Sequence, residues 1–508
     1  MTSRTIIAVG AIGCGALALA AALGAVAPAY PADGAATSPA DAAQVATGAA
    51  PTPAGAPEDP PSKGVTQAQE RSFDKVLAIV EAIPESMRPA GYAAPDAAAV
   101  TALRARARDA KDPGEFRAVV AQLLGSTGLS HHAIIPHDAV PDGDVGEGRH
   151  GMTLAVIDGH AVVTRIEPGS PAAAAGVEPG WRLMSFSGDP LQMVIAPHLH
   201  ARTARERLVQ QQALETFVAA RPGVLVEMEF LDRSGVPRML DITFDEPTVA
   251  TIRFGMLPPI PAECSHRMIE PADWTALGLK ADGAPRVGVI RLGVWMPTLA
   301  PCIDGAVDAL RSCDAIVMDL RGNPGGVGFM ATGVAGHFLT DPVSLGRMIA
   351  PDAVLEFPAN PRLVDTQGNA VRPFAGPLAI LVDGGTASTS EIFAAGMEDH
   401  GRAEIFGGPS AGAALPAITT RLDTGDVLLY AIGDFRSARG RAIEGTGVVQ
   451  GTDAPPSLQD YIDCPDPVLR DALRWIESTR GGSAPARANA TATDAAPGQP
   501  RTETPATP

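Results

Sequence analysis

The stretch GGTASTSEIF (residues 384–393) decides how the rest of the chain is interpreted. It follows PLAILVD, an apolar run typical of a buried strand, and it leads into a segment with helical spacing. Four hydroxyl side chains therefore lie where a strand gives way to a helix. Ser388 with Glu391 matches a helix capping box, whereas the free N–H groups at a helix N-terminus also suit an anionic nucleophile. From this stretch alone, a cap and a nucleophile both remain open.

The residues around this stretch alternate between strand and helix patterns. Strand candidates between residues 285 and 452 are VGVIRL, AIVMDL, PLAILVD and AEIFGG, and helical segments follow most of them. Continuous apolar strands alternating with helices are typical of a parallel sheet covered on both faces. The pattern therefore predicts a layered α/β core.

A second turn that could serve chemistry follows the strand AIVMDL, in the sequence AIVMDLRGNPGG (residues 315–326). Its glycines allow a tight backbone turn with exposed N–H groups, which are what an oxyanion hole requires. An ordinary strand-end turn would have the same composition, so both interpretations stay open here.

Composition divides the chain into six segments. Apolar spacing of three and four favours helices early in the chain, whereas short strands with Gly/Pro turns and one helical insert follow. We expect a signal peptide, a flexible linker, a helical N-terminal domain, a β-rich module with a helical insert, a core domain and a disordered tail. Their boundaries are 1–29, 30–65, 66–148, 149–250, 251–480 and 481–508, respectively.

The N-terminus has the pattern of an export signal. Arg4 supplies the positive flank, residues 6–26 are almost wholly apolar, and Ala27-Pro28-Ala29 offers a cleavage site. We expect a periplasmic or secreted protein. An uncleaved membrane anchor is the alternative, because about 20 apolar residues can span a bilayer, and Cys14 gives a weaker signal for lipidation.

Charge and cysteines limit the classes of partner. The 508-residue chain carries a formal net charge of −18, which argues against binding nucleic acid or an anionic membrane surface. Four cysteines would survive cleavage and allow three pairings. Cys302 and Cys313 lie about 16 Å apart on one expected helix, which excludes a bond between them. No Cys/His cluster suggests a metal site, so we expect neither metal nor organic cofactor.

Three stretches together resemble the C-terminal processing protease and tricorn-type family of serine peptidases. They are DLRGNPGG, GTASTSEIFAAGMEDHGRAEIFGGPSAG and EGTGV. The resemblance implies that Ser388 is the nucleophile. It also implies an oxyanion hole formed by Gly325 and Gly326 with the N–H of Thr389.

The β-rich module resembles a PDZ domain, which this family carries before its catalytic core. GSPAAAAGVEPGWRLMSFSG (residues 169–188) is similar to the second half of such a domain. The edge in RHGMTL would then bind a peptide C-terminus by strand addition through Gly151, Met152, Thr153 and Leu154. The implied fold is multidomain α/β, with a helical N-terminal domain, a PDZ-like module and a ClpP/crotonase-like layered core.

The chain departs from the family at the general base. Processing proteases of this family use a Ser–Lys dyad, but the lysine position falls on Ala413, and the last lysine of the chain is Lys280. An alanine cannot accept a proton, so this chain cannot use the dyad.

The tricorn-type branch offers a different base, a histidine in a Ser-His pair before the PDZ domain. GLSHHAIIP places Ser130 and His131 in the matching position, with His132 as the neighbouring alternative. The branch also uses a glutamate in an E-x-x-G-V stretch, which is Glu444 here. The resemblance thus implies His131 as base, with Glu444 and Ser130 orienting its imidazole.

The resulting hypothesis is an exported serine peptidase acting on a peptide or an unfolded protein. Two alternatives remain: a catalytically silent protein that binds a ligand or peptide on the same scaffold, and a serine esterase with the same chemistry. The substrate, the cleavage preference and the oligomeric state are left open by the sequence.

Overall fold

A computed structural model describes residues 12–14, 63–88, 92, 95–137, 148–196, 204–252, 255–257, 259–448 and 455–479. The expected signal peptide lies outside these residues, apart from β1 (Ile12–Cys14). Most of the expected linker, residues 30–62, and the whole expected tail also lie outside them.

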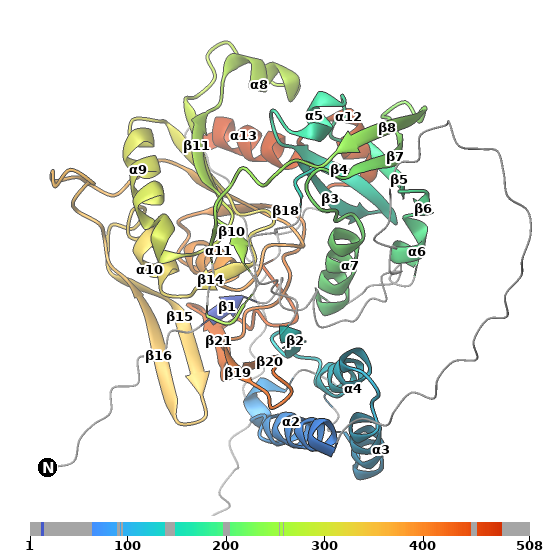
Figure 1. Ribbon diagram of the computed structural model, residues 1–508. Helices are drawn as coiled ribbons and strands as arrows, with labels where there is room; N and C mark the ends of the chain where they lie inside the picture. Colours follow the sequence, from blue (N-terminus) through green and yellow to red (C-terminus); the bar gives the residue numbers. More distant parts are fainter. Residues whose placement is uncertain are drawn as a thin grey trace, which may run out of the picture.

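Residues 264–479 fold around a five-stranded sheet (Figure 1). Its strand order is β11-β12-β13-β17-β18, in which β11 is antiparallel and the other four are parallel. Their bounds are β11 Cys264–Met268, β12 Val287–Leu292, β13 Ala315–Asp319, β17 Leu378–Val382 and β18 Glu404–Gly407. These strands include all four apolar runs from which the core was predicted.

Helices cover both faces of this sheet. Ile316 and Met318 of β13 pack against one helical layer, and Ala315 and Val317 pack against the other. The first layer is α9 (Ala300–Leu310), α10 (Met330–Ala335) and α11 (Thr389–Asp399), and the second is α8 (Pro271–Ala276) and α13 (Pro467–Thr479). All residues of β13 and β17 are buried, as a two-sided sheet requires. The predicted layered α/β core is therefore confirmed.

Two smaller sheets adjoin this core. One has the order β14-β1-β19-β20-β2, and the other is β16-β15-β21. Strands β15 and β16 form the long hairpin at the lower left of Figure 1. The bounds are β14 Gly325–Val327, β19 Ala417–Arg421, β20 Val427–Ala431, β2 Ala133–Ile135, β15 Val343–Ala350, β16 Ala353–Ala359 and β21 Asp434–Ser437. The short pair β9 (Thr251–Ile252) and β10 (Ile260–Pro261) precedes them, and α12 (Leu458–Asp463) precedes α13.

The N-terminal helices are α2 (Lys63–Glu81), α3 (Ala97–Arg108) and α4 (Pro113–Gly125). Asp96 and Asp112 cap α3 and α4, each accepting a bond from the third residue of its helix. Phe73 of α2 and Leu123 of α4 share one hydrophobic cluster with Leu429 of β20. The helices therefore share a core with the strands beside the candidate site, and β2 pairs directly with β20.

Residues 149–245 form an antiparallel sheet of order β3-β4-β5-β7-β8, with β6 paired to β5. The strands are β3 Met152–Ile157, β4 His160–Ile166, β5 Arg182–Phe186, β6 Asp189–Pro190, β7 Leu225–Leu231 and β8 Pro237–Thr243. The helices are α5 Pro171–Ala174, α6 Gln192–Ile195 and α7 Ala204–Phe217. Helix α7 packs against the edge strand β3, and its Leu214 lies in the hydrophobic core of the module. The expected insert is therefore an integral part of this sheet's packing.

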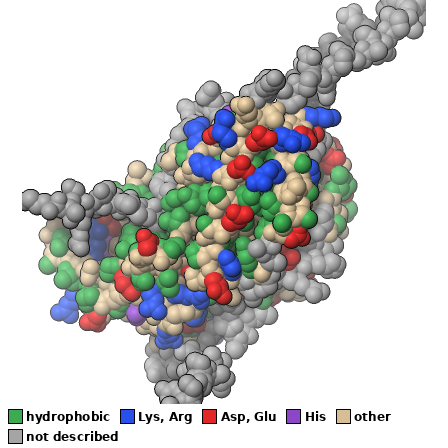
Figure 2. Space-filling model, turned by 90° about the horizontal axis from the view of Figure 1, so that it is seen from below, with side chains coloured by type: hydrophobic (Ala, Val, Ile, Leu, Met, Phe, Trp, Pro, Cys, Tyr) green, Lys and Arg blue, Asp and Glu red, His purple; other side chains and the backbone are tan. Residues whose placement is uncertain are grey.

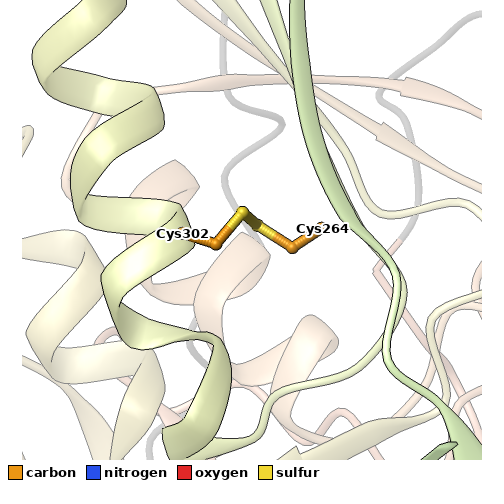
Figure 3. The surroundings of a disulfide bond; sticks show 2 residues. All are labelled: Cys264 and Cys302. Carbon is orange, nitrogen blue, oxygen red and sulfur yellow. A yellow bond between two sulfur atoms is a disulfide. The ribbon is translucent and has the colours of Figure 1, made fainter. Parts of the chain in front are cut away.

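A disulfide joins Cys264 of β11 to Cys302 of α9 (Figure 3). Cys313 and Cys464 are free thiols. The exclusion of a Cys302–Cys313 bond is confirmed, since Cys302 is bonded elsewhere. The bond staples the outer strand of the sheet to a helix that covers one of its faces.

The surface in Figure 2 shows Lys and Arg side chains interspersed with Asp and Glu among apolar ones. That face has no broad basic area of the kind that binds nucleic acid. Among the described residues, no helix is long and apolar enough to cross a membrane.

Candidate active site

Ser388 lies in the turn between β17 and α11, directly before the first helical residue. Its φ of +56° is in the left-handed region, which a residue with a side chain adopts only under constraint. Its N–H donates to the carbonyl oxygen of Ala413 (2.8 Å) and to Oε2 of Glu391 (3.0 Å). The fold therefore holds Ser388 in a strained backbone conformation through two bonds to one N–H group.

The other three hydroxyls of the stretch bind neighbouring backbone. Thr386 Oγ1 donates to Leu320 O (2.9 Å), and Thr389 Oγ1 donates to Gly326 O (3.0 Å). Ser390 Oγ lies 3.2 Å from Asn323 O, to which it donates, and accepts a bond from the indole of Trp295. These hydroxyls fasten the turn to adjacent segments, and Ser388 remains the candidate nucleophile.

The glycine turn after β13 lies beside the nucleophile turn. Asn323 O accepts the N–H of Ala387 (2.9 Å), which brings the two turns together. A Cβ on Gly326 would lie 2.2 Å from Trp295 O, and the φ of Gly326 is +144°, so only glycine fits there. The N–H of Gly325 donates to Oδ1 of Asn323 (2.9 Å) and is thus already bonded. The oxyanion role of Gly325, Gly326 and Thr389 stays a prediction, and Gly326 lies opposite Gly13 of β1.

Ser130, His131 and Glu444 meet in a buried hydrogen-bond chain. Ser130 Oγ lies 2.7 Å from Nδ1 of His131 and donates to Oε2 of Glu444 (2.9 Å). Glu444 also accepts the N–H of Ser130 (2.8 Å) and that of Ala414 (3.2 Å). Residues that are 314 positions apart are therefore joined, in the arrangement expected from the sequence.

His131 is fully buried, and its Nε2 has no hydrogen-bond partner among the residues that the structure describes. Burial lowers the pKa of His131 to about 4, so its imidazole is neutral at physiological pH. Its neighbours Leu129 and Ala133 share a hydrophobic cluster with Ala387 and Ala413, which flank and contact Ser388. His131 and Ser388 therefore adjoin the same hydrophobic cluster, and the structure shows no hydrogen bond between Nε2 and the Ser388 hydroxyl.

The alternative histidine, His132, contacts a different group. Its Nδ1 lies 3.2 Å from Oγ1 of Thr127, at the end of α4. The hydrogen-bond chain to Glu444 runs through His131, and the choice of His131 as the base stays a prediction.

Glu391 is a site residue that sequence reasoning treated only as a capping partner. Its fully buried carboxylate accepts bonds from Ser388 N, Ser410 Oγ (2.5 Å), Gly412 N (2.8 Å) and Ala413 N (2.9 Å). Burial raises the pKa of Glu391 to about 7, and burial likewise raises the pKa of Glu444 to about 7. The only signal in the sequence was its place three residues after Ser388.

The expected peptide-binding residues begin the edge strand β3. The N–H of Met152 donates to Nδ1 of His150 (2.9 Å), and the carbonyl of Leu154 accepts a bond from Gln211 of α7 (2.7 Å). Gly151 has a φ of +83°, and a Cβ there would meet Ser170 at 2.0 Å. Thr153 lies between Met152 and Leu154 in β3. This edge carries polar groups that an added strand could use, although side chains of the module engage two of them here.

No group of three or more potential metal ligands occurs within the part of the chain that the structure describes.

Residues 286–452 match the family model "Peptidase family S41". Carboxyl-terminal-processing peptidase 2, chloroplastic, of Arabidopsis thaliana is 25% identical over 304 residues, covering 58% of this chain and 50% of that protein. Carboxy-terminal processing protease CtpA of Bacillus subtilis is 22% identical over 317 residues, covering 62% of this chain and 57% of that protein. The chain thus spans about half the length of the curated relatives it matches.

Among solved structures, mature CPAF is similar in fold. It has a TM-score of 0.56 and 14% sequence identity, and the match covers 83% of this chain and 99% of that one. A second structure, of mature CPAF complexed with lactacystin, gives a TM-score of 0.52 at 14% identity, covering 82% of this chain and 98% of that one. At these identities the likeness concerns the fold alone.

Proposed function

We propose that the chain is a serine peptidase in which Ser388 attacks the scissile carbonyl, because residues 286–452 match peptidase family S41 and C-terminal processing peptidases are similar to the chain. His131 is its general base, and Ser130 and Glu444 orient the imidazole. The observation that carries the proposal is the buried chain His131–Ser130–Glu444. Glu444, at the end of this chain, binds the N–H of Ala414, and the carbonyl of the preceding Ala413 accepts the N–H of Ser388.

This chain of bonds sets the tautomer of His131. The single proton of the Ser130 hydroxyl goes to the Glu444 carboxylate, so the Ser130 oxygen accepts a bond from Nδ1–H of His131. The lone pair then lies on Nε2, the nitrogen that has no partner. A neutral imidazole with a free Nε2 is the form that can remove a proton.

In acylation, Nε2 of His131 takes the hydroxyl proton of Ser388 while Oγ bonds to the carbonyl carbon. Gly326 and Thr389 donate N–H groups to the resulting oxyanion. The C–N bond then breaks, and the leaving amine receives the proton from His131. In deacylation, a water molecule gives a proton to His131 and attacks the acyl carbon. The ester bond breaks, and the proton returns to Ser388.

An extended substrate can add to the edge of β14. In the structure β1 pairs antiparallel with β14, with Gly13 opposite Gly326, so this edge accepts an added strand next to the nucleophile turn. Because β1 falls inside the expected leader, removal of residues 1–29 would leave the edge to a substrate.

The PDZ-like interpretation of residues 149–250 adds a second contact, in which β3 holds the free C-terminus of the substrate by strand addition. Its support is the edge position of β3 beside α7. A peptide with a free C-terminus should then have a lower KM than the same peptide with an amidated C-terminus. Equal KM values would contradict this contact and leave the serine chemistry unaffected.

We also propose that the protein is exported. The apolar N-terminal stretch has the composition of a leader, and the Cys264–Cys302 bond suits an oxidising compartment.

The proposal is tested by labelling the purified protein with a fluorophosphonate probe, which reacts with activated serines. We expect labelling of the wild type, and none in Ser388→Ala or His131→Ala. No labelling of the wild type would favour a ligand-binding protein on this scaffold. Labelling combined with hydrolysis of small esters but not of peptides would favour an esterase.

A further inference from the structure

Glu391 is a buried titratable group to which the proposed mechanism gives no role. A capping-box glutamate needs only one bond, back to the N–H of the cap residue. Glu391 makes that bond to Ser388 but accepts three more, all from residues 410–413 outside its helix. Burying a carboxylate is costly unless it is fully hydrogen-bonded, so the arrangement exceeds what a helix cap requires.

The four donors divide equally between the two oxygens. Oε2 takes the N–H groups of Ser388 and Ala413, whereas Oε1 takes the hydroxyl of Ser410 and the N–H of Gly412. One oxygen therefore ties the nucleophile directly to the turn, and the other fixes the position of that turn. The carbonyl of Ala413 closes the loop by accepting the N–H of Ser388.

Glu444, which belongs to the hydrogen-bond chain of the proposed base, binds the same turn. Glu444 accepts the N–H of Ala414, the residue after Ala413. Ser410 Oγ also accepts the N–H of Val448 (2.6 Å), and Gly412 O accepts that of Gly445 (2.8 Å). Three consecutive amides, 412 to 414, thus bind two buried carboxylates, one from each half of the site.

We propose that Glu391 is a positioning residue that keeps Ser388 and the His131–Ser130–Glu444 chain in register through the turn 410–414. This inference rests on the proposed function. The strained backbone of Ser388 persists only if its surroundings determine it, and Glu391 supplies one of its two N–H bonds. Without the Glu391 bonds, we expect the backbone of Ser388 to relax and its hydroxyl to lose the position from which the proposed base could deprotonate it.

The decisive variant is Glu391→Gln, which keeps the volume but replaces one oxygen by an NH₂ donor. In either orientation this NH₂ group faces two donors that had bonded to the carboxylate. Ser410→Ala is milder, because it removes one donor and leaves both bonds on Oε2. Glu398→Gln is the matched control, since Glu398 lies on the same helix and pairs with Arg441 away from the turn.

We would measure kcat and KM for a peptide substrate, the rate of fluorophosphonate labelling, and thermal melting for all four proteins. Glu391→Gln should lower kcat and the labelling rate by about 10²-fold with little change in KM, the size expected for a misplaced reacting group. Ser410→Ala should lower kcat by about tenfold, the loss of one charge-assisted bond. Glu398→Gln should stay within about twofold, as exposed ion pairs contribute little.

The outcomes separate the two claims. If the wild type is labelled, and Glu391→Gln and Ser410→Ala melt cooperatively and are labelled at the wild-type rate, then Glu391 does not have the proposed role. The peptidase proposal would remain intact in that case. A rise in KM alone would also overturn it, because that would indicate substrate binding rather than positioning. A wild type that neither labels nor cleaves would overturn both. If Glu391→Gln does not fold, Ser410→Ala decides.

Discussion

The nucleophile half of the site and the base half are built in different ways. The nucleophile half is local: Ser388 and Glu391 lie within one turn of sequence, and the backbone of Ser388 is strained. The base half joins the adjacent residues Ser130 and His131 to Glu444, which lies 314 positions after Ser130, and Nε2 of His131 has no partner among the described residues. The residues of the nucleophile half are close in sequence and are held by the turn 410–414, whereas the base half joins segments that are distant in the chain.

This difference predicts which substitutions disturb the geometry of each half. The nucleophile half loses geometry when a bond within its turn is removed. The base half loses geometry when any of its contributing segments shifts, because the turn 410–414 is the part that both halves bind.

The largest expected effect comes from removing the reacting groups themselves. Ser388→Ala and His131→Ala should each lower kcat by at least about 10⁴-fold, and the double variant should be no worse than either, because the two residues act as one unit. Steady-state kinetics on a peptide substrate measures all three.

His132→Asn is the matched control for the base, because His132 contacts Thr127 instead. It should retain activity. If His131→Ala were active and His132→Asn were not, the base would be the neighbouring histidine.

Disturbing the orientation of the His131 imidazole should lower kcat by a smaller factor than removing His131. Glu444→Gln leaves Ser388 and His131 in place but weakens the acceptor that fixes the Ser130 hydroxyl, so we expect kcat to fall by about 10²-fold. Ser130→Ala should give a loss of the same order. Wild-type rates in both variants would show that His131 needs no partner, which would contradict the base half as described.

The pH dependence of activity should reflect the titrating groups of both halves of the site. The pKa of His131 is lowered to about 4, so it stays neutral and competent from about pH 5 upward. The buried carboxyls of Glu391 and Glu444, with pKa raised to about 7, ionise and become full acceptors only as pH rises through that value. We expect kcat/KM to increase between about pH 5 and pH 8 and the increase to shrink in Glu444→Gln.

Stability should change in the opposite direction. Because the folded pKa of Glu444 exceeds its unfolded value, its contribution to the free energy of unfolding is complete below about pH 4.5 and is lost as pH rises through about 7. His131 contributes with the opposite sign, gaining as pH rises from about 4 to about 6.5. Denaturant unfolding of the wild type and of Glu444→Gln, measured as a function of pH, gives the contribution of the Glu444 carboxyl to the free energy of unfolding. The same pH dependence in both proteins would contradict this contribution.

The smallest expected effect on chemistry comes from the disulfide, which joins the edge strand β11 to α9. Trp295, seven residues before Cys302, binds the backbone of Gly325 and Val327, but those bonds do not need the disulfide. Replacing Cys264 and Cys302 by serine should lower the free energy of unfolding by about 4 kcal/mol, from the 38-residue separation in the chain-entropy estimate. Activity per folded molecule should change little.

Cys313→Ser is the control for this variant, since Cys313 is a free thiol. Its stability should change by about 1 kcal/mol or less. A large loss of kcat in the disulfide variant, measured well below its melting temperature, would show that the nucleophile half depends on this staple.

The sequence predicted most reliably what is encoded locally. Continuous apolar runs predicted the parallel strands. The turns after two of these strands offered Ser388 and the glycines as candidates, and their roles came from the family resemblance. Ser130, His131 and Glu444 came from a resemblance, because no periodicity joins residues 314 positions apart.

Two features lay beyond sequence reasoning for physical reasons. The role of Glu391 depends on backbone N–H groups of residues 412 and 413, which every non-proline residue carries and which therefore leave no signal in the sequence. The packing of α7 on β3 also depends on tertiary contacts, and from the sequence this helix was an insert.

The most direct test of the central claim is a crystal structure of the protein after reaction with the fluorophosphonate probe. The account predicts a phosphorus atom bonded to Ser388 Oγ, with His131 Nε2 about 2.6–3.2 Å from that oxygen. A probe on another residue, or an adduct on Ser388 with His131 Nε2 still unpartnered and out of reach, would contradict it.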